Sequence, residues 1–101
     1  MNEFGQTPQF VDWFARLADL TARARIRSRL RQAMAGHFGD CTPVGEGVSE
    51  MRIHHGPGYR VYYAREGATV YLLLAGGDKS SQGRDIAKAK ALWADAKKGT
   101  P

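Results

Sequence analysis

The sequence predicts a single α+β domain, in which a helix pair and a C-terminal helix pack on a small antiparallel sheet. Two changes in the periodicity of apolar residues predict this class. Apolar residues recur at helical spacing over residues 8–36 and again after residue 81, whereas residues 48–75 alternate with a period of two. Glycines and a proline separate the first segment of helical spacing from the segment with a period of two. A length of 101 residues fits one domain over residues 1–101.

The helix pair begins at Pro8. Thr7 can cap this helix, and proline at the first helical position lacks an N–H group that would be unpaired anyway. The pattern pauses before Thr21, which can cap a second helix that ends near Gly36. We therefore expect residues 8–36 to form an antiparallel helix pair or one strongly bent helix. The residues before Thr7 are too few to assign, although a short strand is compatible with them.

Three strands follow and form a meander. In the first, which starts at Val48, Arg52 and His54 share one face of the strand. The triplet at residues 56–58 (Gly-Pro-Gly) predicts a type II turn into a second strand at residues 59–65. Residues 69–75 form the third strand, and their nearly continuous apolar run indicates a central, well-covered position.

A glycine-rich segment at residues 76–81 ends the sheet, and a serine in it can cap the last helix. Residues 97–101 are expected to fray. The apolar stripe of the helix contains Ile86, Ala89, Trp93 and Ala96.

The composition is that of a small basic protein. Fifteen lysines and arginines against ten aspartates and glutamates give a formal net charge of +5, which favours an anionic partner. No apolar run approaches the ~20 residues that span a bilayer, and the N-terminus lacks the pattern of a secretory signal. Cys41 is the only cysteine, which excludes an internal disulfide and is typical of the reducing cytosol. We therefore expect a cytoplasmic protein with no membrane partner.

Residues 23–31 contain five arginines and no carboxylate. On a helix, the spacing places three of them on one face and two on another. They can form a solvated surface, an interface for an acidic protein, or a surface that binds RNA phosphates, because guanidinium pairs bidentately with phosphate. The candidate RNA-binding residues are Arg23, Arg25, Arg27, Arg29 and Arg31.

A second basic group lies on the predicted strand pair. In the simplest register of the turn, Arg52 and His54 lie opposite Tyr62 and Arg60, with Lys79 adjacent at the end of the third strand. Phosphodiester cleavage needs a base for the attacking hydroxyl, cations for the developing charge and an acid for the leaving oxygen. RNA is the favoured substrate because its 2′-hydroxyl can attack without a metal-bound water. The candidate catalytic residues are Arg52, His54, Arg60, Tyr62 and Lys79.

Structural roles remain open for these residues. Arg52 and Arg60 can pair with Glu50 or Glu66, and Lys79 can pair with Asp78 on the surface. The segment at residues 76–81 lacks the spacing of a phosphate-binding loop. The histidines and the cysteine lack metal-ligand spacing, so we expect no metal and no cofactor.

Several segments, in order, resemble a known toxin family. They are Gly47-Val48-Ser49-Glu50-Met51-Arg52-Ile53, Gly56-Pro57-Gly58-Tyr59-Arg60-Val61-Tyr62-Tyr63 and Leu74-Ala75-Gly76-Gly77-Asp78-Lys79-Ser80-Ser81-Gln82, with Asp85, Ile86 and Ala89. The N-terminal half adds Phe10, Trp13, Leu17, Asp19, Ala24-Arg25-Ile26 and Arg29-Leu30. From residue 7 to about residue 96, the chain is similar to the phage Gp49-like/HigB group of the RelE/ParE superfamily, often labelled addiction module killer protein.

The resemblance implies a compact RelE-like fold with an N-terminal strand, two helices, an antiparallel sheet and a C-terminal helix. It implies the toxin of a type II toxin–antitoxin pair, neutralised by a cognate antitoxin protein; we expect a monomer without the antitoxin. RelE- and HigB-type members cut mRNA in the ribosomal A site, which implies an mRNA interferase, a metal-independent endoribonuclease that inhibits translation. ParE-type members instead inhibit DNA gyrase, and an inactive RNA-binding module is a third hypothesis. Arg52, Arg60 and Lys79 are positions in the motifs of the Gp49-like/HigB group.

Overall fold

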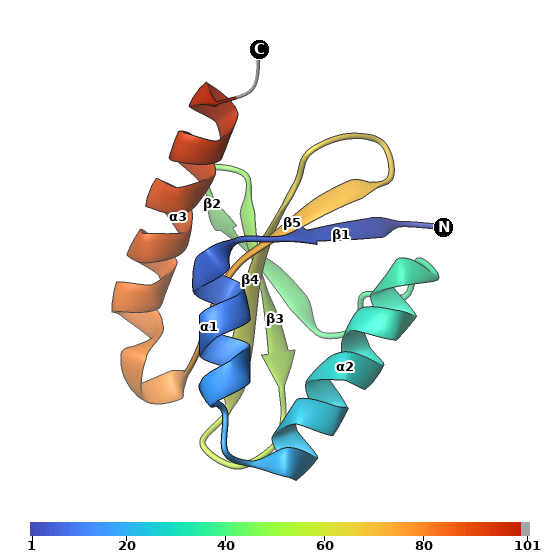
Figure 1. The fold of residues 1–101 in the computed structure, drawn as a ribbon, viewed down its shortest axis with the longest axis vertical. Helices are drawn as coiled ribbons and strands as arrows, with labels where there is room; N and C mark the ends of the chain where they lie inside the picture. Colours follow the sequence, from blue (N-terminus) through green and yellow to red (C-terminus); the bar gives the residue numbers. More distant parts are fainter. Residues whose placement is uncertain (100–101) are drawn as a thin grey trace.

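The computed structural model describes residues 1–99 and has the expected α+β class (Figure 1). All the predicted helices and strands are present. A strand over residues 3–6 is the N-terminal strand that the resemblance implied, and a short strand over residues 41–45 is added. In chain order the elements are β1 (Glu3–Gln6), α1 (Pro8–Arg16), α2 (Leu20–Met34), β2 (Cys41–Gly45), β3 (Val48–Ile53), β4 (Tyr59–Arg65), β5 (Val70–Asp78), the 3₁₀ turn η1 (Lys79–Ser81) and α3 (Gln82–Lys98).

The sheet has five strands in the order β1-β5-β4-β3-β2. The predicted meander is confirmed as β3–β4–β5, and β5 is an interior strand between β1 and β4, although β4 is the middle strand of the five. The expectation of a purely antiparallel sheet is wrong, because β1 pairs with β5 in parallel. The second edge strand, β2, contains Pro43 and Gly45 with a register shift between them. Proline and glycine are depleted in strands, so the sequence does not indicate a strand here.

The helix ends follow from specific caps. The Thr7 hydroxyl accepts a hydrogen bond from the Phe10 N–H, as predicted for the start of α1. The predicted Thr21 cap of α2 is wrong, because the Asp19 carboxylate accepts from the Ala22 N–H. Leu17 and Asp19 both have extended backbone, so residues 8–36 form two separate helices.

The C-terminal helix begins after Ser81, but the Ser81 hydroxyl makes no capping bond and hydrogen-bonds the Asp85 carboxylate instead. The helix continues to Lys98. Residues 100–101 of the predicted frayed segment lie outside the described residues.

Alternate residues of β4 build two separate cores. Val61 and Tyr63 pack with residues of α1 and α2 on one face of the sheet. Tyr62 and Ala64 pack with Ala89 of α3 on the other face. The helix α3 packs on this second face only. Polar residues that β3 and β4 present on the same face lie at the edge of the area that α3 covers.

Two glycines of β5 let the helices approach the sheet closely. A Cβ on Gly76 would lie 2.2 Å from the Trp13 ring of α1, and a Cβ on Gly77 would lie 1.8 Å from the Asp85 carboxylate of α3. A side chain at either position would force the Trp13 ring or the Asp85 carboxylate to move. This gives a packing reason for the Gly-Gly pair in the predicted motif.

Candidate functional site

The register of β3 and β4 differs from the predicted one. Arg52 lies opposite Arg60, so the predicted pairing of Arg52 with Tyr62 is wrong. The loop between the strands contains five residues, from 54 to 58, and has positive φ angles at both Gly56 and Gly58. Its closing bond runs from the Gly58 N–H to the His55 carbonyl. The turn therefore centres one residue earlier than the proline predicted, which shifts every pair by two residues.

This register places a buried carboxylate among the predicted site residues. The Glu50 side chain lies opposite Tyr62, and the residue is only 3% exposed. Its Oε2 atom lies 3.4 Å from the Arg60 Nε, and its Oε1 atom lies 3.6 Å from the Arg52 Nε. The alternative in which both arginines pair with Glu50 is thus confirmed. We call Glu50, Arg52, Arg60, Tyr62 and Gln82 the Glu50 cluster.

Tyr62 and Gln82 complete the contacts of this carboxylate. The Tyr62 hydroxyl donates to Glu50 Oε2 over 3.1 Å, and the Gln82 amide donates to the same oxygen over 2.9 Å. Tyr62 is fully buried, and its burial, together with the Glu50 charge, raises the pKa of its phenol above the ordinary value. The predicted role of Tyr62 in proton transfer therefore does not fit its position. Tyr62 instead holds Glu50 in place.

A second carboxylate, Asp40, extends the cluster to an exposed histidine. Asp40 Oδ1 lies 3.8 Å from the Arg52 Nε, and Asp40 Oδ2 lies 2.6 Å from the His54 Nε2. The hydrogen bond from His54 and the charge of Arg52 lower the pKa of Asp40. The His54 side chain is 75% exposed. A continuous chain of ion pairs and hydrogen bonds therefore runs Arg60–Glu50–Arg52–Asp40–His54.

The sequence does not indicate Asp40 as a site residue, because it does not indicate the strand β2 that places it. The strand that follows it pairs with β3, and the Arg52 N–H donates to the Asp40 carbonyl over 2.9 Å. Recognising residues 41–45 as a strand would have placed Asp40 beside Arg52. The neighbouring His55 turns elsewhere, with its Nε2 atom 3.0 Å from the carboxylate of Asp19, the cap of α2.

Lys79 is the free cation next to the Glu50 cluster. It begins η1, directly after β5, and is exposed. Its Cβ lies 3.6 Å from the place a Cβ would take on Gly58, and an Arg60 terminal nitrogen lies 3.8 Å from that place. The predicted alternative of a pair with Asp78 is not found, because Asp78 accepts from the Ser80 N–H and hydroxyl. Among residues 1–99, no side chain forms an ion pair with the Lys79 ammonium.

The α2 arginines lie on two faces, as predicted, but they do different things. Arg23 and Arg27 both lie over the Phe14 ring, at 5.2 and 5.1 Å from its centre. Arg29 donates to the backbone carbonyls of Arg52 and Phe38, which gives it a structural role, and its predicted role in RNA binding stays a prediction. Arg25 and Arg31 are exposed and have no ion-pair partner within the described part of the chain.

Residues 1–99 contain neither a metal-binding cluster nor a helix that could span a membrane. No group of three or more histidines, cysteines and acids is arranged to hold a metal ion there. None of the helices in this range is long and apolar enough to cross a membrane.

Comparison with known proteins places the chain beside one relative. No family model and no solved structure match it. A Haemophilus influenzae protein described as an uncharacterized protein is 43% identical over 86 residues, which cover 85% of this chain and 87% of that protein. The chain belongs to the family of this protein. The relationship carries no activity with it, so an assignment of function depends on the chemistry of the site.

The site combines an oriented imidazole with cations. When the His54 Nε2–H donates to Asp40, the Nδ1 atom is left as an acceptor, a tautomer we assign from the hydrogen bond. Arg60 and Lys79 flank Gly58 at the other end of the same five-residue loop. A carboxylate-oriented imidazole with neighbouring cations can transfer protons beside a bound anion.

Proposed function

We propose that the protein is the toxin of a type II toxin–antitoxin pair, in the Gp49-like/HigB group, and that it cleaves mRNA on the ribosome. The ordered motifs at residues 47–53, 56–63 and 74–82 support this proposal. The element order is also consistent with a RelE-like fold, because β1 precedes two helices and α3 follows the sheet. Its partners would be the ribosome, mRNA and a cognate antitoxin protein.

The observation that carries the proposal is the exposed imidazole of His54, held by Asp40 at 2.6 Å. RNA cleavage by its own 2′-hydroxyl needs a base that takes the hydroxyl proton, and a histidine suits this role near neutral pH. Asp40 also faces Arg52, so the same carboxylate orients the base and links it to the Glu50 cluster.

In the proposed reaction, His54 Nδ1 takes the 2′-hydroxyl proton while the oxygen attacks the adjacent phosphorus. The bond from phosphorus to the 5′-oxygen breaks, and the imidazolium returns the proton to that leaving oxygen. The products are a 2′,3′-cyclic phosphate and a 5′-hydroxyl. Lys79 and Arg60 stabilise the charge that develops on the phosphate oxygens. Of these two cations, Lys79 is the more available, because Arg60 is already paired with Glu50.

Expression in a bacterial host, with growth measured and mRNA ends mapped on translating ribosomes, tests the proposal. His54→Gln and Lys79→Ala are expected to abolish cleavage without moving the melting temperature, because both side chains are exposed. Lys98→Ala removes the same charge from the end of α3 and is expected to cleave normally. Growth arrest with intact mRNA and stalled gyrase would instead support the gyrase-inhibiting alternative. No growth arrest would favour the RNA-binding module.

A further inference from the structure

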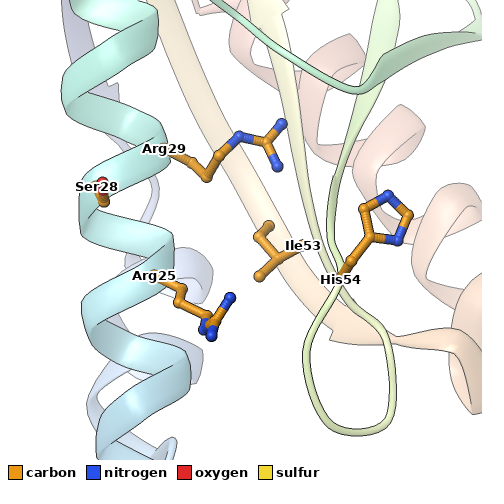
Figure 2. Close-up of a pocket in the computed structure, with 5 residues that line it drawn as sticks. All are labelled: Arg25, Ser28, Arg29, Ile53 and His54. Atoms are coloured by element: carbon orange, nitrogen blue, oxygen red, sulfur yellow. The ribbon is translucent and has the colours of Figure 1, made fainter.

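A cavity of about 280 Å³ lies between α2 and the end of β3 (Figure 2). Ligand pockets commonly measure ~300–1,000 Å³, so this one suits a small group rather than a large cofactor. Figure 2 shows Arg25 and Arg29 reaching from α2 toward Ile53, at the end of β3, where the loop that carries His54 begins. We call it the α2 pocket, and its lining residues are Arg25, Ser28, Arg29, Ile53 and His54.

The α2 pocket has hydrogen-bond donors and lacks acids. Its lining contains two guanidinium groups, a hydroxyl and an imidazole, with Ile53 as its apolar residue. The nearest carboxylates on neighbouring elements are already engaged, since Asp40 binds His54 and Asp19 binds His55. The remaining positive charge is therefore not balanced within the pocket.

The two arginines of the α2 pocket differ in whether their guanidinium groups are already hydrogen-bonded. Arg29 is fixed, because it donates to the carbonyls of Arg52 and Phe38. Arg25, one helical turn earlier, is exposed, and no hydrogen bond or ion pair within residues 1–99 occupies its guanidinium. The fixed Arg29 guanidinium makes the electrostatic potential of the pocket positive. The free Arg25 guanidinium beside it can bind a planar or tetrahedral anion through its N–H donors.

We propose that the α2 pocket binds a single phosphate group, with Arg25 and the Ser28 hydroxyl as its donors. Arg29 contributes positive charge at the wall of the pocket, and His54 also lines it. The phosphate can belong to an RNA backbone or to a free phosphomonoester, since both present the same oxygens. This inference deepens the proposed function, because His54 belongs to both sites and an RNA ligand rests on that function, but phosphate binding is measured separately from cleavage.

Amide and imidazole NMR spectra of the full chain, recorded at a low and at a high ionic strength that are each held constant during the titration, test the proposal. The probes are inorganic phosphate, adenosine monophosphate and a six-nucleotide RNA, each compared with chloride. Saturable shifts are expected at Ser28, Ile53 and His54. Arg25→Ala should weaken binding about tenfold, because it removes charge-assisted hydrogen bonds. Arg84→Ala removes an exposed arginine from α3 and should change binding less than about twofold.

The outcomes distinguish an RNA backbone phosphate from a phosphomonoester, and distinguish both from results that contradict the proposal. Tighter binding of RNA, with a dissociation constant that rises with salt, identifies a backbone phosphate. Tighter binding of adenosine monophosphate than of the RNA identifies a phosphomonoester. Equal effects of Arg25→Ala and Arg84→Ala, shifts that chloride reproduces, or no shift at Ser28 would overturn the proposal. Ser28→Ala is a second variant that leaves charge unchanged and should still weaken binding.

Discussion

The Glu50 cluster and the α2 pocket use the same residue type in opposite ways. In the Glu50 cluster, the Arg60 side chain is 12% exposed and lies against a buried carboxylate. In the α2 pocket, Arg25 is exposed and faces no acid. An arginine beside a buried acid is committed to the fold, because leaving either charge alone there is costly. An arginine without one is free to bind an external anion.

The largest expected effect comes from removing the acid that organises the Glu50 cluster. Glu50→Ala leaves the partly buried Arg60 without its ion-pair partner and leaves Arg52 with Asp40 alone. Breaking a buried ion pair from one side costs about 3–5 kcal/mol, and we expect a loss of that order in the free energy of unfolding, measured by urea denaturation.

Glu46→Ala is the matched control for this prediction. Glu46 pairs with Lys90 at 3.6 Å, but its side chain is 72% exposed, and exposed pairs contribute about 0–1 kcal/mol. If the two variants lose the same stability, the Glu50 cluster is not a structural centre, and its arginines are as free as Arg25.

The next effect tests how closely α3 must approach the cluster. Gly77→Ala would place a Cβ 1.8 Å from the Asp85 carboxylate, so this buried side chain must shift, on the same helix that carries the Gln82 amide bound to Glu50. Overpacking of this kind costs about 1–3 kcal/mol. Gly83→Ala is the control, because it meets nothing within 4 Å and an alanine in a helix gains about 0.5–1 kcal/mol. The thermal unfolding of both variants checks the prediction, which fails if Gly77→Ala melts like the wild type.

Within α2, a third comparison separates a structural arginine from a free one. Arg29→Ala removes the donors to the Arg52 and Phe38 carbonyls. Hydrogen bonds from charged donors contribute about 1.5–3 kcal/mol, so we expect a loss near the lower end of that range in urea denaturation. Arg31→Ala, two residues later and exposed, should stay within about 0.5 kcal/mol of the wild type. A larger loss for Arg31→Ala would contradict this division of the helix.

The sequence predicted the elements with strong periodicity well. Both helices of the pair, the meander and α3 follow from apolar spacing, since burial of one face needs that spacing. The short strands could not be predicted in this way. β2 contains proline and glycine, and β1 is held by pairing with β5, a partner about 67 residues away in the chain. Tertiary pairing rather than local preference forms both.

The candidate site was predicted by residue type but not by arrangement. Arg52, His54, Arg60 and Lys79 do lie around the β3–β4 loop, as the face alternation indicated. The loop conformation moved the register by two residues, and alternation alone cannot detect a shift that preserves the faces. Tyr62 kept its predicted face and yet is fully buried, because α3 covers that part of the sheet.

The smallest effect lies at the exposed end of the chain of ion pairs, and it depends on pH. Hydrogen bonds lower the pKa of Asp40 and of Asp19 below the ordinary value of 3.8, with His54 as the main cause for Asp40 and the Ala22 N–H for Asp19. A carboxyl whose pKa is lower in the folded state contributes stability above its unfolded pKa, and that contribution is lost as the pH falls through the folded pKa. The free energy of unfolding should therefore decline below about pH 4.

Two single variants isolate this contribution from the other carboxyls. Asp40→Asn removes the charge that faces His54 and Arg52, whereas Asp19→Asn removes a charge but keeps a side chain able to cap α2. Each should lose less stability than the wild type between pH 5 and about pH 2 in urea denaturation. An unchanged slope in Asp40→Asn would mean that the His54 pair is open in solution. His54 would then be an unoriented surface histidine, and only the buried Glu50 end of the chain of ion pairs would be ordered.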